Sequence, residues 1–325
     1  MKALICPELG SIENLRVADI ESPKLGNGQV RIGVHAAGIN FPDILMAEGK
    51  YQVKPELPFV PGLECSGEVL EVADGVSHVK IGDRVLAFAR RGGAFAAECV
   101  VPGQIVTPMP DDMDFIHAAA FPVAYGTAHF ALAHRGQLQQ GETLLVLGAT
   151  GGVGIAAIEI GKLLGARVIA AAGSGEKLEI AKQYGADEVI NYRTENLRDR
   201  VKELTADKGA DVVFDPVGGE AFDQSVRCIG WQGRILVIGF ASGDIPKVAT
   251  NMILVKNFSV IGVVFGEHSW RYPMETRERL TGLLPSVSAG DLNPRVHEVY
   301  PVEEAKAALM EIQKRSVIGK LVLTL

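Results

Sequence analysis

The sequence predicts an α/β protein of two domains, one β-rich and one built on a doubly wound parallel sheet of six strands. Three observations predict this fold. The length of 325 residues suits two domains of roughly 100–200 residues each. Short apolar stretches separated by glycine and proline fill the first 120 residues or so. From about residue 140, apolar strand-like runs alternate with helical stretches.

The first region has the pattern of short strands joined by tight turns. Turn dipeptides stand between its apolar runs at Pro61-Gly62, Asp74-Gly75 and Gly82-Asp83. Such a pattern is typical of a β-rich domain with barrel-like closure. The expected strands are residues 29–37, 66–72, 83–88 and 98–101.

The second region predicts six β–α repeats, and therefore a parallel sheet covered by helices on both faces. The expected strands are residues 143–147, 167–172, 188–191, 211–215, 234–239 and 258–264. The expected helices are residues 152–164, 176–184, 196–205 and 220–228, the first two ending at Gly165 and Gly185. The last strand-like run has no partner in this repeat, so we expect it to return to the first domain. The expected domains are residues 1–122 and 123–265, with a returning segment at 266–325.

Composition and charge exclude several classes of protein. Apolar residues make up 47% and charged residues 22% of the chain, which is globular and argues against disorder. Lys and Arg number 32 against 39 Asp and Glu, and a net charge of −7 argues against nucleic acid or an anionic membrane as partner. No signal-peptide or membrane-spanning pattern is visible, and four scattered cysteines predict neither disulfides nor a cysteine zinc site. We expect a cytoplasmic protein.

The most informative local pattern is the glycine loop that follows the first strand of the repeat. Thr143 to Gly154 reads TLLVLGATGGVG, a strand followed by Ala149-x-Gly151-x-x-Gly154 at the start of a helix. A dinucleotide pyrophosphate can approach the backbone of such a turn and accept hydrogen bonds from the helix N-terminus. Thr150, Gly151, Gly152, Val153 and Gly154 are therefore candidate cofactor-binding residues. Glycine turns also occur with no ligand, but the place of this one in the repeat favours a Rossmann cofactor site.

The end of the second strand indicates which nicotinamide cofactor would bind. An NAD site has Asp or Glu at about this point, whereas this chain has Ala171-Ala172-Gly173-Ser174 and no carboxylate at the strand tip. Gly173, Ser174 and Lys177 suit the 2′-phosphate of NADPH better than a bare ribose. Ser174 can also act as the N-cap of the following helix, and the two roles are compatible.

Several stretches together resemble the zinc-lacking quinone oxidoreductase branch of the medium-chain dehydrogenase/reductase superfamily. They are residues 37–43 (AGINFPD), 58–64 (PFVPGLE), 82–85 (GDRV), 121–127 (FPVAYGT), 148–154, 215–219 (DPVGG) and Gly319-Lys320. The resemblance runs nearly end to end. It implies a GroES-like β-rich first domain, a Rossmann NADPH-binding domain and an oxidoreductase activity.

Departures from the zinc enzymes of the superfamily predict that no catalytic metal is bound. Asn40 stands where those enzymes carry a cysteine ligand, and Leu63 precedes Glu64 where they carry histidine. No histidine lies in a recognisable ligand pattern. Without a Lewis acid the substrate must need little polarisation. A quinone or another planar or conjugated carbonyl meets that condition, because hydride addition gives a stabilised phenolate or enolate.

The remaining catalytic task is a hydrogen bond to the oxygen that gains charge. Tyr51 resembles the active-site tyrosine of the branch and is the first candidate donor, although it could be only a half-buried packing aromatic. Asn40 could donate an amide hydrogen or orient the substrate or cofactor, although it could be only a turn residue before Phe41-Pro42. The resemblance implies further cofactor-binding positions, which are Thr127, Tyr192, Gly239, Phe240, Val263, Val264, Phe265 and Lys320.

Three functions remain open on the sequence alone. The first is an NADPH-dependent quinone reductase, and the second is an NADPH-dependent reductase of 2-alkenals, enones or enoyl thioesters. The third is a non-catalytic NADPH-binding protein. The apolar run at 258–264 should form a sheet edge that a lone domain would leave open, and similar proteins join two such edges, so we expect a homodimer.

Overall fold

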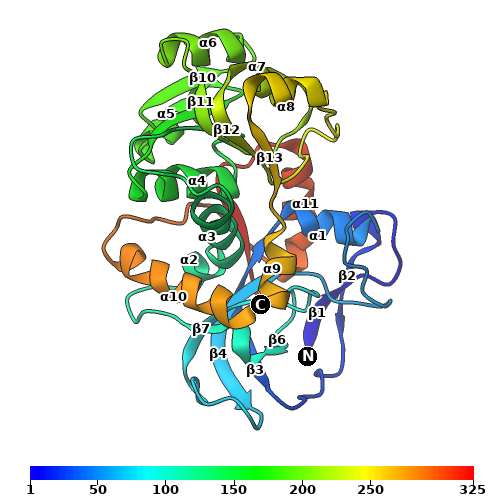
Figure 1. The fold of residues 1–325 in the computed structure, drawn as a ribbon. Helices are drawn as coiled ribbons and strands as arrows, with labels where there is room; N and C mark the ends of the chain where they lie inside the picture. Colours follow the sequence, from blue (N-terminus) through cyan, green and yellow to red (C-terminus); the bar gives the residue numbers. More distant parts are fainter. The chain divides into compact units, whose positions relative to one another are not determined.

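The computed structural model describes all residues, Met1–Leu325, in two compact units (Figure 1). The first unit combines Met1–Gly126 with Gly266–Leu325, and the second unit comprises Thr127–Phe265. Helix α3 (Pro122–His129), followed by a π-helical turn at Phe130–Arg135, carries the chain from one unit into the other.

The second unit contains a six-stranded sheet in the order β10-β9-β8-β11-β12-β13, with every neighbouring pair parallel. Its strands are β8 (Thr143–Leu147), β9 (Arg167–Ala172), β10 (Glu188–Asn191), β11 (Ala210–Asp215), β12 (Ile229–Val237) and β13 (Ser259–Gly262). This order confirms the predicted doubly wound parallel sheet. The chain reverses direction across the sheet between β8 and β11, which is where such folds bind ligands.

Helices cover both faces of this sheet, as the alternation of strand side chains requires. The helices are α4 (Gly152–Leu163), α5 (Gly175–Gln183), α6 (Leu197–Leu204), α7 (Gly219–Cys228) and α8 (Thr250–Lys256). On one face, Leu197 and Val201 of α6 pack with Phe222 of α7 against Leu145 and Ile169. On the other face α4 lies so close that a Cβ on Gly161 would be 2.6 Å from Leu144 Cδ2.

Strand β12 begins five residues before the predicted start at residue 234. The segment Ile229-Gly-Trp-Gln-Gly233 has the composition of a turn, and Gln232 adopts a positive φ of 60°. The structure nevertheless keeps it within the strand, and the pairing of β12 with β11 shifts register between Ala210 and Val212. The glycines therefore mark an irregularity inside the strand.

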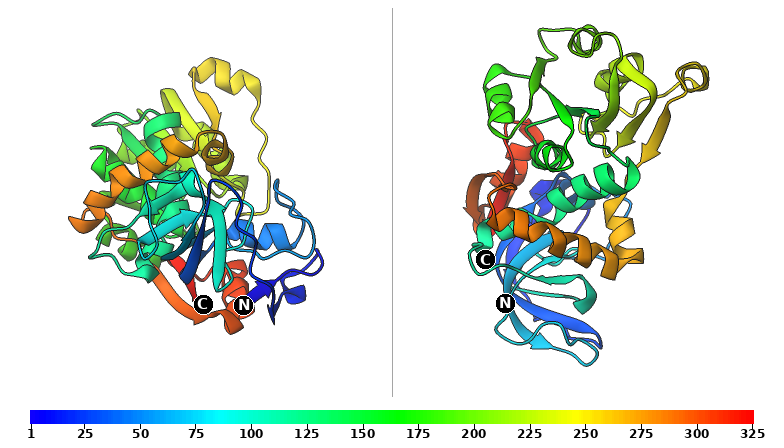
Figure 2. Two further views of the ribbon diagram at one scale, coloured as in Figure 1. Left: turned by 90° about the horizontal axis from the view of Figure 1, so that it is seen from below. Right: turned by 60° about the vertical axis from the view of Figure 1, so that its left-hand side comes forward.

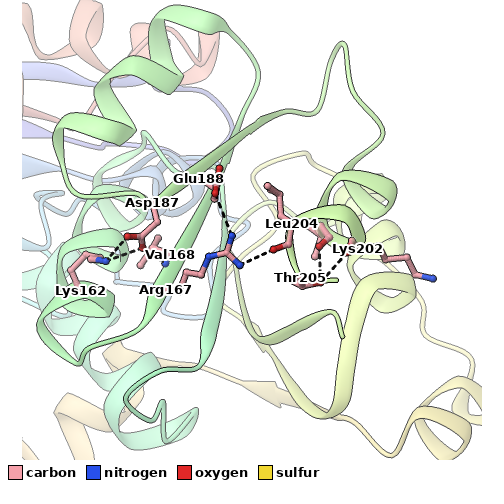
Figure 3. Close-up of polar contacts among 9 residues, drawn as sticks. Lys162, Arg167, Val168, Asp187, Glu188, Lys202, Leu204 and Thr205 are labelled. Atoms are coloured by element: carbon pink, nitrogen blue, oxygen red, sulfur yellow. Dashed lines mark hydrogen bonds and ion pairs between the residues drawn. The ribbon is translucent and has the colours of Figure 1, made fainter. Parts of the chain in front are cut away.

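Polar contacts fasten the start of β9 to its neighbours (Figure 3). Lys162 at the end of α4 donates two hydrogen bonds of 2.8 Å to Asp187, whose Oδ2 also accepts from the Val168 N–H at 2.7 Å. Arg167 donates to Leu204 O at 2.7 Å and to Glu188 Oε1 at 3.3 Å. These bonds hold α4, α6 and β10 against the amino end of β9.

The first unit is built on a seven-stranded sheet in the order β14-β15-β3-β4-β5-β7, with β6 also paired to β3. Its strands are β3 (Gln29–Ile39), β4 (Glu64–Val72), β5 (Arg84–Phe88), β6 (Glu98–Pro102), β7 (Val106–Pro108), β14 (Val296–Pro301) and β15 (Lys320–Thr324). Strand β15, at the end of the chain, pairs antiparallel with Ala36–Ile39 of β3. The pairing places Lys320 beside the residues that follow β3.

Short elements complete the first unit. They are β1 (Lys2–Ile5), β2 (Arg16–Asp19), α1 (Phe41–Ala47), α2 (Phe115–Ala119), α9 (Phe265–Arg271), α10 (Pro273–Ser288) and α11 (Ala305–Lys314), with 3-10 turns at Ile12–Asn14, Gly103–Ile105 and Val302–Glu304. Helix α10 lies along β7 and the turn Gly103–Ile105 (Figures 1 and 2). None of the chain's helices combines the length and apolar composition that crossing a bilayer requires.

Candidate active site

The glycine loop at 148–154 joins β8 to α4 in the second unit. Gly148 has a φ of 56°, and a Cβ on Gly154 would lie only 2.3 Å from Gly148 O, so the turn requires glycine at both positions. No side chain caps α4, whose N-cap residue is Gly151. The first N–H groups of the helix, at Gly152, Val153 and Gly154, therefore point out of it without an intrahelical partner. They can bind an anion such as a pyrophosphate.

The loops that follow β11 and β12 lie close to this turn. A Cβ on Gly148 would be 3.0 Å from Val217 Cγ2 in the loop after β11. That loop is held by buried Asp215, whose Oδ1 accepts the N–H groups of Val217 and Gly218 at 2.8 Å each. Phe240, one of the sequence candidates after β12, has its ring beside Gly218. The structure thus brings the glycine loop after β8, the loop after β11 and Phe240 after β12 together where the strand order of the sheet reverses.

Two basic side chains, Lys177 and Arg193, lie at the tip of β9, and only Lys177 was predicted from the sequence. Arg193 Nε lies 3.0 Å from where a Cβ on Gly173 would be, and its charge acts on Lys177. Burial and then the nearby Arg193 charge lower the pKa of Lys177, which Glu176 partly offsets. Ser174 is the N-cap of α5, with its hydroxyl 3.4 Å from the Lys177 N–H. No carboxylate lies between Ala171 and Ser174. This tip suits a phosphate group.

The other sequence candidates of the second unit lie in α3, directly after β10 and directly after β13. Tyr192 follows β10, with its N–H 3.3 Å from Ala172 O, and Thr127 is buried in α3. Val263 extends β13 through an N–H bond of 3.0 Å to Val237 O, whereas Val264 is 57% exposed. Phe265 is buried and its ring tilts against Phe130 at 6.2 Å between centroids.

A buried ion cluster in the first unit contains Asn40 and Glu64, which lie where this sequence departs from the zinc enzymes. Lys320 Nζ donates to Glu64 Oε1 at 2.6 Å, to Asn40 Oδ1 at 2.6 Å and to Ile39 O at 2.7 Å. Asn40 Nδ2 donates in turn to Glu64 Oε1 at 2.8 Å and to Gly38 O at 3.3 Å. Glu64 is fully buried, and its Oε2 accepts the Val123 N–H in the first turn of α3 at 2.7 Å.

These contacts bear on the expected roles of two candidates. An ammonium has three hydrogens, and all three of Lys320 are donated inside the first unit, so none is left for a cofactor. Both amide hydrogens of Asn40 are likewise donated to protein oxygens. The roles of Lys320 toward the cofactor and of Asn40 toward the substrate remain predictions, and in this structure both side chains are engaged within the first unit. Asn40 is also the N-cap residue of α1.

A second buried carboxyl group lies beside this cluster. Asp43 is 1% exposed; its Oδ2 accepts the Asn40 N–H at 2.7 Å, while Oδ1 has no hydrogen bond. Burial raises the pKa of Asp43 to about 7, although the Asn40 N–H and the Lys320 charge act in the opposite direction. Lys320 already balances Glu64, so proton uptake by Asp43 keeps the buried group of charges neutral.

Tyr51, the candidate donor predicted from the sequence, lies in the first unit. Its chain turns back on α1, with the Tyr51 N–H 3.1 Å from Leu45 O. A Cβ on Gly266 would lie 3.9 Å from Tyr51 Oη and 3.6 Å from Phe88 Cζ. Burial, and then the Asp43 carboxyl, raises the pKa of Tyr51, while the Arg90 guanidinium lowers it. The phenol therefore keeps its proton at neutral pH and can donate it in a hydrogen bond.

The chain presents no group of three or more His, Cys, Asp and Glu side chains that could hold a metal ion. The two zinc-ligand positions of related enzymes hold Asn40 and Leu63, neither of which is a zinc ligand of the usual kind. The nearest cation to Asn40 is the Lys320 ammonium, which is part of the chain itself.

Comparisons with known proteins agree with this architecture. Residues 26–111 match the alcohol dehydrogenase GroES-like domain, and residues 152–279 match the zinc-binding dehydrogenase domain. A GroES-like domain with a Rossmann domain defines the medium-chain dehydrogenase/reductase class.

Relatives narrow the class to a family. Quinone oxidoreductase-like protein 2 homolog from Nematostella vectensis is 43% identical, with 99% of this chain and 88% of the relative aligned. Human quinone oxidoreductase is 32% identical, with 100% and 98% aligned. The crystal structure of Escherichia coli quinone oxidoreductase complexed with NADPH covers 100% of both chains at 27% identity, with a TM-score of 0.92. The chain therefore belongs to the quinone oxidoreductase-like family of medium-chain dehydrogenases/reductases, which is an oxidoreductase family.

Proposed function

We propose that the protein is an NADPH-dependent quinone reductase that works without a metal. The cofactor supplies a hydride when it is bound. The quinone gains that hydride and one proton to become a hydroquinone, and NADP⁺ is left. The observation that carries the proposal is the tip of β9, where Lys177 and Arg193 lie close to one another and no carboxylate stands between Ala171 and Ser174.

The second unit would hold the cofactor through groups that fit its phosphates. The uncapped N–H groups of Gly152, Val153 and Gly154 suit the pyrophosphate. The Ser174 hydroxyl and the charges of Lys177 and Arg193 suit the 2′-phosphate, which carries nearly two negative charges. That the homologous Escherichia coli enzyme has a structure with NADPH supports the same choice here.

The first unit would supply the hydrogen bond to the acceptor oxygen. Tyr51 donates its phenolic hydrogen to the carbonyl oxygen, and this bond strengthens as charge develops there. The Arg90 guanidinium helps, because its charge favours negative charge close to the phenol. Asn40, Glu64 and Lys320 act behind this site by fixing the starts of α1 and α3, and we assign them a positioning role.

A panel of acceptors tests the proposal. NADPH oxidation is followed with naphthoquinone, a 2-alkenal and an enoyl thioester of coenzyme A, each at matched concentration. We expect the quinone to give the highest kcat/KM. A higher value for the alkenal or the thioester would make the protein an enoyl reductase. Tight NADPH binding with no acceptor reduced would make it a non-catalytic binding protein.

We propose further that the protein is a homodimer joined through the β13 edge. Beside this edge, α8 buries none of its residues, and Leu254 and Val255 are 80% and 70% exposed. Trp231 at the start of β12 is also exposed, and α8 stands out from the second unit in both views of Figure 2. A second copy would cover these apolar groups and the open strand. Light scattering should give twice 34.7 kDa, and a value of 34.7 kDa at micromolar concentration would contradict the dimer.

A further inference from the structure

We propose that a pocket beside Tyr51 binds an anionic group of the acceptor, so that the enzyme favours quinones carrying a sulfonate, carboxylate or phosphate. This inference rests on the proposed function in one respect, namely that Tyr51 holds the carbonyl of the acceptor. The pocket itself lies wholly within the first unit.

The pocket is a cavity of about 360 Å³ between the segment after β5, the strand β6 with its following turn, and the junction of α9 and α10. Pockets that bind small organic molecules begin at roughly 300 Å³. Apolar side chains form much of the wall, including Phe88, Ile105 and Trp270. The cavity is therefore large enough for the substituted end of a planar bicyclic molecule.

All the charged side chains that line the pocket are positive. Its lining contains two ionisable side chains, Arg90 and Arg91, and no carboxylate; the polar remainder is neutral, Gln29, Gln104 and Ser269. Both guanidinium centres lie over Trp270, at 5.5 and 5.1 Å from the ring centroid. The indole thus holds two like charges near one another at the pocket wall.

The carboxylate that pairs with Arg90 does not neutralise both arginines. Glu267 pairs with Arg90, but it also accepts from Arg271 Nε at 2.8 Å. One negative charge is therefore shared by two guanidinium groups. Arg91 forms no ion pair and is exposed. An anion that enters the pocket would find Arg91 uncommitted, with planar donors that match a carboxylate or sulfonate.

Two residues of the pocket wall connect it to the proposed catalytic hydroxyl. Phe88, which lines the pocket, lies beside Gly266, and Gly266 lies beside Tyr51 Oη. Arg90 also lines the pocket, and its charge acts on the Tyr51 phenol. The proposal places a carbonyl of the acceptor at Tyr51 and its anionic substituent at Arg91.

The test compares 1,4-naphthoquinone with 1,4-naphthoquinone-2-sulfonate in the parent and in Arg91→Gln. We expect Arg91→Gln to raise the KM for the sulfonate about tenfold, since an exposed charge-assisted bond is lost, and to change the KM for the neutral quinone less than twofold. The control is Arg16→Gln, which removes the same charge from exposed β2 and should alter neither value. Equal effects on the two acceptors, or no effect on either, would overturn the proposal.

A binding measurement separates this inference from the proposed function. Naphthalene-2-sulfonate cannot be reduced, and calorimetry measures its affinity without turnover. We expect it to bind the parent about tenfold more tightly than Arg91→Gln, while Arg16→Gln binds like the parent. Equal affinities in all three proteins would refute the anion pocket even if quinones are reduced. The expected difference with no quinone reduction would retain the pocket and refute the function.

Discussion

Replacing Lys320 by methionine tests the buried ion cluster of the first unit. The substitution removes an ammonium with three hydrogen bonds and leaves the Glu64 carboxylate buried without a cation. Loss of one partner from a buried pair costs about 3–5 kcal/mol. Asn40 Nδ2 and the Val123 N–H still donate to Glu64. We therefore expect the free energy of unfolding to fall by about 3 kcal/mol, at the lower end of that range.

The assay is urea unfolding followed by tryptophan fluorescence, with two comparison variants. Lys320→Met combined with Glu64→Gln removes both charges and should recover all but about 1 kcal/mol of the loss. Lys162→Met removes an ammonium that also makes an ion pair, with Asp187 (Figure 3). Both side chains of this pair are exposed, so the substitution should cost less than about 1 kcal/mol. If Lys320→Met costs no more than Lys162→Met, or if the double variant is no better than the single one, the cluster does not stabilise the unit as argued.

Four further outcomes are expected. Lys177→Ala and Arg193→Ala should each raise the KM for NADPH about tenfold and leave that for NADH nearly unchanged; parallel changes for both cofactors would exclude a phosphate site at the tip of β9. Tyr51→Phe should lower kcat roughly tenfold with NADPH affinity unchanged, and a kcat within error of the parent would reduce Tyr51 to a packing residue. Asp43 has a pKa of about 7 in the folded protein against 3.8 as a free group, so between pH 3.8 and pH 7 the folded protein binds a proton that the unfolded chain does not. The free energy of unfolding therefore falls as the pH rises through this interval, by about 4 kcal/mol in total. Unfolding curves of Asp43→Asn should lack this loss between about pH 4 and pH 7, and the same slope in parent and variant would contradict the assignment. Prolonged chelation should leave quinone reduction unchanged, whereas one zinc per chain whose removal abolishes turnover would refute metal independence.

The fold class could be predicted because its signals are local. Each strand of the second unit is a short apolar run, its first four helices have an apolar face, and glycines mark the ends of α4 and α5. The start of β12 at Ile229 could not be predicted from the sequence. The glycine-rich stretch there has the composition of a turn, and only its place beside β11 shows that it belongs to a strand. Pairing between strands decided that boundary.

The candidate site was predictable only where its residues are adjacent in sequence. The loop at 148–154 is one continuous segment, and its geometry agrees with its pattern. Lys320 meets Glu64 and Asn40 across 256 and 280 residues, so no spacing rule could show that its ammonium is already used. Arg193 was not predicted, although it stands directly after Tyr192. Its basic side chain just after the third strand was a signal that could have indicated a second phosphate ligand.

The most direct test of the account is the cofactor preference of the unmodified protein with naphthoquinone as acceptor. Two charge-assisted bonds at the 2′-phosphate, discounted for exposure, correspond to roughly 3 kcal/mol, or about a hundredfold in kcat/KM for NADPH over NADH. The account predicts a ratio of that order, measured from the loss of reduced-nicotinamide absorbance. Equal kcat/KM values for the two cofactors, or no oxidation of NADPH by the quinone, would contradict it.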